Sequence, residues 1–147
     1  MDTSAKIQYG LTGLQAFMLQ ALPSAVIVLV DENTLKYCYP LVAPLLPVHQ
    51  LIEIKSGEQN KGLDTCTYIW QQLTHANIDR GGLLVNLGGG VIGDMGGFAA
   101  GCYKRGIRFI NIPTTLLSMA DASVGAKTGI DFSGFKNYLN GSVILKV

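Results

Sequence analysis

One stretch decides how this chain folds: LLVNLGGGVIGDMGGFAAG, residues 83–101. It begins as a short apolar strand, ends that strand on three consecutive glycines, and continues as a helix of small residues with Asp94 near its start. Glycine lets a backbone approach a pyrophosphate because no Cβ intervenes, and the amino end of a helix directs unpaired N–H groups and the positive end of its dipole at the anion. The stretch therefore predicts a phosphate site between a strand and a helix.

The spacing of Gly88, Gly90 and Gly93 fits G-x-G-x-x-G, the fingerprint of dinucleotide-binding folds. The acidic residue that usually follows about 20 positions later is missing. Asp31, however, stands at the carboxyl end of the apolar run VIVLV, residues 26–30, where it could bind a ribose. The parts of a nucleotide site are thus present in an order unlike that of an ordinary dehydrogenase. The alternative is a glycine-rich turn that binds no ligand.

The length of 147 residues suits a single globular domain. With a mean hydropathy of +0.31 and 14% charged residues, the chain is more apolar than a typical free-standing domain, so it has an extensive hidden surface or is part of something larger. No apolar run reaches the roughly 18 residues of a membrane span and the amino terminus lacks a signal-peptide pattern, so we expect a cytoplasmic location and no membrane partner. The net charge of +1 gives no case for a nucleic-acid partner.

Apolar strands alternate with helical patterns along the chain. Strands are expected at residues 26–30, 51–54, 83–87 and 107–112, and helices at 14–22, at 34–46 with Pro40, Pro44 and Pro47 as limits, at 63–78, and from the glycine turn onward. Strands separated by helices predict an α/β domain over residues 1–147, with a Rossmann-like parallel sheet and helices on both faces. Ligands of such sheets bind beyond the carboxyl ends of the strands, so Asp31, residues 88–94 and residues 113–115 are expected to line one crevice.

A second polar cluster follows the last of these strands. The segment INIPTTLLSMADASVGAKTGIDFSGFKN, residues 110–137, contains Thr114, Thr115, Asp121, Lys127, Lys136 and Asn137. From Lys104 onward the chain has six basic and two acidic residues, and this excess favours a site for a phosphorylated or carboxylated substrate. The alternatives are a solvated surface loop and, for Thr115, a cap on the helix that follows Pro113.

Four segments together resemble the 3-dehydroquinate synthase family: GGGVIGDMGGFAAGCYKRGIRFINIPTTLLS, ASVGAKTGI, FKN, and GEQNK at residues 57–61. The resemblance extends from about residue 26 to residue 137, with the motifs in the family's order. It implies NAD- and metal-dependent cyclisation of 3-deoxy-D-arabino-heptulosonate 7-phosphate, a sugar acid phosphate, to 3-dehydroquinate. This carbon–oxygen lyase reaction releases phosphate and belongs to the shikimate pathway of aromatic amino acid biosynthesis.

The resemblance also implies roles for individual residues. The positions that match NAD-binding residues are Asp31, Glu58, Lys61, Gly89, Gly90, Val91, Asp94, Thr114, Thr115, Asp121, Lys127 and Asn137. The positions that match catalytic or substrate-binding residues are Asp121, Lys127, Lys136, Asn137 and Arg105. In the family, the arginine at the position of Arg105 reaches the substrate phosphate from the neighbouring subunit, which implies a homodimer. The alternative for Arg105 is a solvated charge at a helix end.

The chain departs from the family pattern at Ala126, where glycine is usual, and this puts a tight backbone turn in question. In the family, a divalent metal, zinc or cobalt, is held by a glutamate and two histidines of a helical C-terminal domain. This chain has only His49 and His75, without ligand-like spacing, and three widely spaced cysteines, so we expect no metal site in it.

We therefore expect the chain to be the N-terminal NAD-binding part of a longer or truncated enzyme, lacking the helical C-terminal domain and inactive in isolation. Two alternatives remain open. One is another sugar-phosphate cyclase, such as 2-deoxy-scyllo-inosose synthase or 2-epi-5-epi-valiolone synthase. The other is a domain that binds a nucleotide without catalysing a reaction.

Overall fold

The computed structural model describes residues 10–122 and 127–142; for residues 121, 122, 141 and 142 it describes the backbone alone. Its elements in chain order are α1 (Thr12–Ala21), β1 (Val26–Asp31), α2 (Glu32–Tyr37), α3 (Tyr39–Val42), η1 (Ala43–Leu45), β2 (His49–Ile54), η2 (Glu58–Asn60), α4 (Leu63–His75), β3 (Leu83–Gly88), α5 (Gly90–Cys102), η3 (Tyr103–Arg105), β4 (Arg108–Pro113), η4 (Ser118–Ala122), β5 (Lys127–Phe132) and β6 (Phe135–Ser142). Ala126, where the chain departs from the family pattern, lies outside the described residues.

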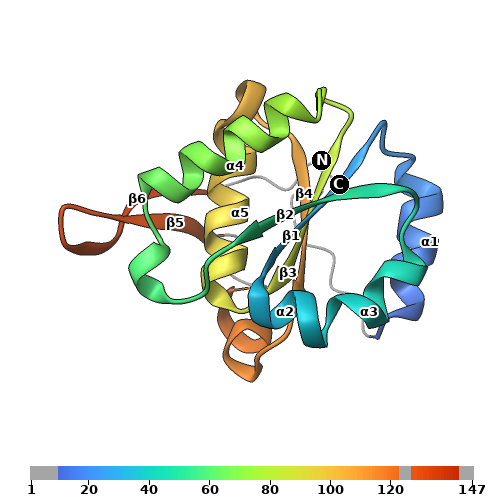
Figure 1. Cartoon of the computed structure of the whole chain (residues 1–147), viewed down its shortest axis with the longest axis horizontal. Coiled ribbons are helices and arrows are strands. Elements are labelled where there is room, and N and C mark those ends of the chain that lie inside the picture. Colours follow the sequence, from blue (N-terminus) through green and yellow to red (C-terminus); the bar gives the residue numbers. More distant parts are fainter. Residues whose placement is uncertain (1–9, 123–126, 143–147) are drawn as a thin grey trace.

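Four parallel strands form the central sheet in the order β2-β1-β3-β4. Strand β1 is buried on both sides: Ile27 and Leu29 pack with α4 and α5, whereas Val26, Val28 and Val30 pack with α1 and α3. A parallel strand covered on both faces reads as a continuous apolar run for this reason. Figure 1 shows α4 and α5 on one side of the sheet and α1 on the other. The predicted α/β fold with helices on both faces is confirmed.

Helix α5 packs unusually close to its neighbours because glycines face them. A Cβ built on Gly96 would lie 1.9 Å from Oδ1 of Asn86 in β3, and one built on Gly97 would lie 2.3 Å from Cγ2 of Thr128 in β5. Real Cβ atoms do not approach other atoms so closely, so a larger residue at either position would force Asn86 or Thr128 to move. The small residues of the stretch after the glycine turn therefore set the height of α5 above the sheet.

The single helix expected over residues 34–46 is wrong in its bounds. The helix begins two residues earlier, at Glu32, because Asp31 caps it, and it stops at Tyr37. A second short helix, α3, starts at Tyr39 with Pro40 in its first turn, and a 3-10 turn with Pro44 follows. Proline has no N–H to donate to the preceding turn, so each proline starts a new helical segment.

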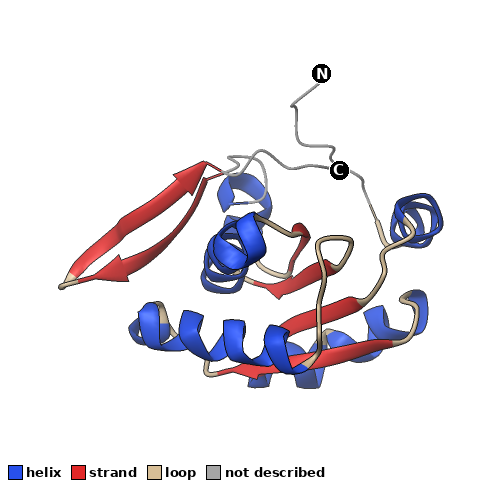
Figure 2. Cartoon of the chain, turned by 90° about the horizontal axis from the view of Figure 1, so that it is seen from above, coloured by secondary structure: helices blue, strands red, loops and turns tan. Residues whose placement is uncertain are grey.

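Part of the polar segment after β4 has regular structure where an open surface loop was one alternative. It includes an antiparallel hairpin of β5 and β6, joined by the two-residue turn Ser133 and Gly134 with φ angles of 52° and 82°. Two consecutive residues with positive φ match the twist of flanking antiparallel strands. Thr128 and Ile130 are buried in contact with the core, while the hairpin extends away from the parallel sheet (Figure 2).

The other strands and helices begin and end within a few residues of the bounds expected from the sequence. Strand β2 shows the expected alternation, with Ile52 and Ile54 buried and Leu51 and Glu53 exposed. Helix α4 ends at His75, three residues before the expected end. Among the described residues, no helix has the length and apolar character needed to cross a membrane.

Candidate functional site

Three neighbouring strands end at the same edge of the sheet. Strand β3 pairs with β4 up to Gly88 and Pro113, and the pairing of Leu29 with Asn86 places Asp31 level with Gly88 two residues later. The expectation that Asp31, the glycine turn and the Pro113–Thr115 turn share one edge is therefore met by the fold. This carboxyl edge is where parallel α/β sheets bind ligands.

The glycine turn leaves the amino end of α5 open. Gly89 precedes the helix and no side chain of the described residues caps it, and the first intrahelical bond in the turn runs from Gly93 N to Gly89 O at 3.1 Å. The N–H groups of residues 90–92 thus have no acceptor within the helix. Within the described part of the chain, a Cβ on Gly90 would meet nothing within 4 Å. This opening beside unpaired donors fits an anionic group such as a pyrophosphate.

A small hollow lies under the glycine turn. It is lined by Asn86, Gly88, Gly89, Gly93, Asn111, Pro113 and Ser118. Asn86 is 1% exposed and donates from Nδ2 to Oδ1 of Asn111 over 2.9 Å, while its own Oδ1 has no partner among the described residues. Sequence reasoning missed this asparagine pair, although a polar residue inside each of two buried strands was the available signal.

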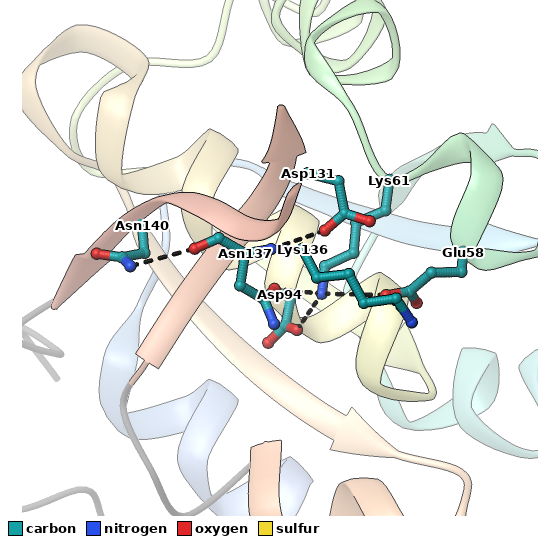
Figure 3. A network of polar contacts seen from close by, with 7 residues as sticks. All are labelled: Glu58, Lys61, Asp94, Asp131, Lys136, Asn137 and Asn140. Atoms are coloured by element: carbon teal, nitrogen blue, oxygen red, sulfur yellow. Dashed lines mark hydrogen bonds and ion pairs between the residues drawn. The ribbon is translucent and has the colours of Figure 1, made fainter. Parts of the chain in front are cut away.

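Lys61 is the centre of a polar network that joins three segments (Figure 3). Its side chain is 3% exposed, and Nζ donates to Oδ2 of Asp94 at 2.7 Å and to Oδ1 of Asn137 at 2.6 Å. The backbone O of Lys61 accepts from Asp131 N at 2.9 Å. Lys61 therefore ties the glycine-started helix to the hairpin through both its ammonium and its backbone.

The hairpin residues around Asn137 hold it in an uncommon conformation. Asn137 has φ of 49°, and its N–H donates to Oδ1 of Asp131 at 2.8 Å. Nδ2 of Asn140 donates to its carbonyl at 3.2 Å. Asp131 and Asn140 had no role in the sequence analysis, and because they act by contacts that the hairpin creates, no motif pointed to them.

Glu58 and Lys136 meet at the rim of this network. The Lys136 ammonium lies 3.8 Å from Oε1 of Glu58, and the Lys61 ammonium lies 4.0 Å from the same oxygen. The Lys136 side chain is 76% exposed, so this contact is a weak surface ion pair. Lys127 pairs with Ser142 at the opposite end of the hairpin. Strand geometry separates the Cα atoms of the two lysines by roughly 15 Å.

Two of the expected cofactor residues also cap helices. Oδ1 of Asp31 accepts from the N–H groups of Asn33 and Thr34, and this cap uses only one of its two carboxylate oxygens. Oγ1 of Thr115 accepts from Ser118 N at 3.2 Å, as the capping alternative for this threonine predicted. Thr115 nevertheless flanks the glycine turn, since a Cβ on Gly89 would lie 3.3 Å from its Cγ2.

The segment before Glu58 is tied to the edge as well. Ser56 donates from N and from Oγ to the carboxylate of Glu32 in the first turn of α2. These hydrogen bonds, the Ser56 hydroxyl first, lower the pKa of Glu32 below its ordinary value. The turn that contains Glu58 is thereby anchored to the start of α2.

Arg105 lies at the other edge of the sheet, after the carboxyl end of α5. It is exposed, and among the described residues no acceptor binds its guanidinium. Asp121 falls in η4, near the carboxyl edge, with its side chain outside the description. The structure thus places Asp31, the glycine turn and the Pro113–Thr115 turn at one edge of the sheet, and it links Glu58, Lys61, Asp94 and Asn137 in one network. Lys127 lies apart from Lys136, and Arg105 lies at the far edge.

The described residues contain no group of three His, Cys, Asp or Glu side chains that could hold a metal ion. His49 is held between two partners: its Nδ1 faces the carbonyl of Pro47 at 2.7 Å and its Nε2 faces the hydroxyl of Tyr39 at 2.7 Å. A carbonyl only accepts, so Nδ1 donates to Pro47, and in the neutral imidazole Nε2 then accepts from Tyr39. His75 lies in the last turn of α4.

The sequence and the fold of this chain are similar to those of known proteins. A model of the 3-dehydroquinate synthase N-terminal family matches residues 51–144. A 3-dehydroquinate synthase from Parabacteroides distasonis is 47% identical over 126 residues, which cover 84% of this chain and 36% of that protein.

Two solved structures are similar in fold and in sequence. A 2-deoxy-scyllo-inosose synthase complexed with carbaglucose-6-phosphate, NAD+ and Co2+ matches with a TM-score of 0.78 and 26% identity, covering 91% of this chain and 38% of that one. A 2-epi-5-epi-valiolone synthase from Streptomyces hygroscopicus with NAD+ and Zn2+ bound matches with a TM-score of 0.77 and 30% identity, covering 88% and 38%. The chain spans about a third of the length of these relatives.

Proposed function

Because the chain belongs to the 3-dehydroquinate synthase family, we propose that it forms the NAD-binding part of an enzyme that converts 3-deoxy-D-arabino-heptulosonate 7-phosphate to 3-dehydroquinate and phosphate. The observation that carries this proposal is the open, uncapped amino end of α5 at the carboxyl edge of the sheet, in the segment that matches the family. The enzyme is a soluble cytoplasmic lyase of aromatic amino acid biosynthesis that acts as a homodimer.

The pyrophosphate of NAD binds along Gly89, Gly90 and Val91. Two observations support this placement: N–H groups without intrahelical acceptors and space for an approaching group at Gly90. Asp94 lies one helical turn further on and fixes the ammonium of Lys61 beside the turn. Bound NAD supplies the oxidation of a substrate hydroxyl and the later return of the hydride.

The adenosine half extends toward Asp31, Glu58 and Lys61. The cap on α2 occupies Oδ1 of Asp31, so Oδ2 is the oxygen that accepts from a ribose hydroxyl. The Glu58 carboxylate is partly exposed beside the buried Lys61 ammonium, which leaves it open to a hydroxyl donor. Thr114 and Thr115 flank the turn from β4 and contact the cofactor from that side.

The substrate binds between the glycine turn and the hairpin. Lys127 and Lys136 stand at opposite ends of the hairpin, so each neutralises a different anionic group, and the substrate has two: a carboxylate and a phosphate. Asn137 and Asp121 contact the nicotinamide side and the substrate together. These groups orient the ring and place charge where the reaction needs it.

Arg105 binds the substrate phosphate of the second subunit. Support comes from its exposure and from its place at the far edge of the sheet, where its own subunit offers no acceptor among the described residues. The described residues offer no ligand set for the divalent metal, zinc or cobalt, that the family reaction uses; its ligands would come from the C-terminal domain, where it would serve to polarise the alcohol to be oxidised.

Between the sugar-phosphate cyclases, sequence identity favours dehydroquinate synthesis. The Parabacteroides distasonis relative is 47% identical, whereas the two other cyclases are 26% and 30% identical. The substrate of the second candidate would be a hexose phosphate of the kind represented by carbaglucose-6-phosphate in the first of these structures.

The test uses the complete enzyme, meaning the protein in which this chain is followed by the C-terminal domain proposed above. The enzyme is freed of NAD and assayed for phosphate release from the heptulosonate phosphate, with and without added NAD, beside glucose 6-phosphate as comparison substrate. NAD-dependent release from the heptulosonate phosphate alone is the expected result. Release only from glucose 6-phosphate would favour another cyclase, and NAD binding without any release would favour a domain that binds without catalysing.

A further inference from the structure

The turn that joins α5 to β4 has a backbone that residues with a Cβ rarely adopt. Lys104 has φ of 48°, Arg105 has φ of 66°, and Gly106 follows with φ of 104°. For a lysine and an arginine in succession the left-handed region is unfavourable, because the Cβ crowds the following carbonyl. Such a conformation persists only where its surroundings hold it, and it is enriched at functional positions.

Two long basic side chains hold this turn from the outside. Nζ of Lys104 donates to the carbonyl of Ile78 over 2.7 Å, and Nε of Arg80 donates to the carbonyl of Lys104 over 3.0 Å. On the inner side, the buried Tyr103 contacts Oγ1 of Thr74 through its hydroxyl at 3.0 Å. The loop after α4 and the turn after α5 are therefore joined through both the ammonium and the backbone carbonyl of Lys104.

What this arrangement presents is the side chain of Arg105. Its side chain is exposed, and among the described residues it binds no acceptor. Its two neighbours in the chain are held in place, Lys104 by its bond to Ile78 and Gly106 by its N–H bond to the carbonyl of Tyr103. Oδ1 of Asp79, in the loop after α4, accepts from Ser24 Oγ and Gly81 N, and no hydrogen bond or ion pair joins Asp79 to Arg105 among the described residues. Arg80 and Lys104 add positive charge around Arg105, so the surface favours an anion from outside the chain.

That anion cannot be one bound at the glycine turn of the same chain. Helix α5 has 13 residues and runs from the glycine turn to the far edge, a length of about 20 Å. An arginine side chain does not span this distance. Arg105 therefore does not reach a ligand bound at the glycine turn of its own chain.

We propose that Arg80 and Lys104 are positioning residues, which hold the left-handed turn so that Arg105 reaches the substrate phosphate bound to a second copy of the chain. This inference rests on the proposed function, which gives Arg105 its ligand. Neither Arg80 nor Lys104 contacts the substrate. Their effect passes through the backbone of residues 104 and 105.

The experiment compares Lys104→Met, Arg80→Gln, Arg105→Gln and the pair Lys104→Met/Arg105→Gln in the complete enzyme, with Lys36→Met on exposed α2 as control. We expect Lys104→Met and Arg80→Gln each to raise KM for the heptulosonate phosphate at least about threefold while NAD affinity stays within about twofold.

Inorganic phosphate should inhibit both variants more weakly than wild type. Lys104→Arg, which keeps a donor for Ile78, should recover part of the loss. The double variant should be no worse than Arg105→Gln alone, because residues that act through one group are not additive.

An unchanged KM in Lys104→Met and Arg80→Gln, or additive losses in the double variant, would overturn the inference. So would an equal loss of NAD affinity and thermal stability, because that pattern marks a general folding defect. If Arg105→Gln itself behaves as wild type while turnover is intact, the positioning role is refuted and the proposed reaction stands. A wild-type enzyme without turnover refutes the reaction and this inference with it.

Discussion

Lys61 and Asp94 form an ion pair of 2.7 Å in which the lysine side chain is 3% exposed. The pair joins the segment before α4 to the helix that starts at the glycine turn, and the same ammonium donates to Asn137 in the hairpin. The helix that starts at the glycine turn and the hairpin are therefore held by one buried charge.

Replacing Lys61 with methionine should destabilise the complete enzyme. Removal of one partner from a fully buried pair costs about 3–5 kcal/mol because the other charge is left unpaired. The Asp94 side chain is 20% exposed, so water compensates part of this and we expect about 2–3 kcal/mol. Thermal unfolding measures the loss, and exposed Lys55→Met is the control. Equal melting temperatures for the two variants would contradict the structural role of the pair.

The close approach of α5 to β3 predicts that Gly96→Ala destabilises the fold, although alanine is the better helix former. The added Cβ would lie 1.9 Å from Oδ1 of Asn86, and forced packing of this kind costs about 1–3 kcal/mol. Combining it with Asn86→Ala removes the clashing atom, so the double variant should be more stable than Gly96→Ala alone. Urea unfolding of the three variants decides. No rescue in the double variant would mean that the clash is not the cause.

Much of the fold was readable in the sequence because parallel strands buried on both sides are continuous apolar runs, as VIVLV and the strand before the glycines show. The glycine turn and Asp31 were placed at one edge by the same reasoning. The hairpin was not predicted, since its strands are rich in glycine and polar residues, and among its described side chains Thr128, Ile130 and Leu139 are the ones that pack inward. The bonds from Lys61 to the hairpin depend on that packing, so no local pattern could indicate them.

The cysteines should differ in reactivity. Burial raises the pKa of Cys66 to about 12, so at pH 8 about one thiol in 10,000 is the reactive thiolate. Burial also raises the pKa of Cys102, but that residue is exposed. Iodoacetamide should therefore modify Cys102 in the native protein and Cys66 only after unfolding, as peptide mass spectrometry would show. Modification of both at one rate under native conditions would contradict the packing of α4.

Lys127→Met and Lys136→Met should each lower kcat/KM by at least about tenfold. A charge-assisted contact to a desolvated carboxylate or phosphate is worth roughly 1.5 to 3 kcal/mol, which corresponds to this factor or more. Arginine should not substitute well, because its planar fork does not occupy the place of a compact ammonium. The surface pair between Lys136 and Glu58 adds little stability, so melting temperatures should not change. Near wild-type turnover in both variants would mean that these lysines are solvated surface charges without a role in substrate binding.

Gly90→Val tests whether the pyrophosphate of NAD binds along the glycine turn. A Cβ at Gly90 meets nothing within 4 Å, so the variant should fold normally while its side chain fills the space proposed for the pyrophosphate. Gly62→Val is a matched control, since Gly62 precedes α4 and its added Cβ would lie 4.0 Å from the nearest neighbour. Calorimetric titration of the complete enzyme with NAD should show at least about a tenfold loss of affinity, or 1.4 kcal/mol, in Gly90→Val alone. Unchanged NAD affinity in a normally folded Gly90→Val enzyme would contradict the account.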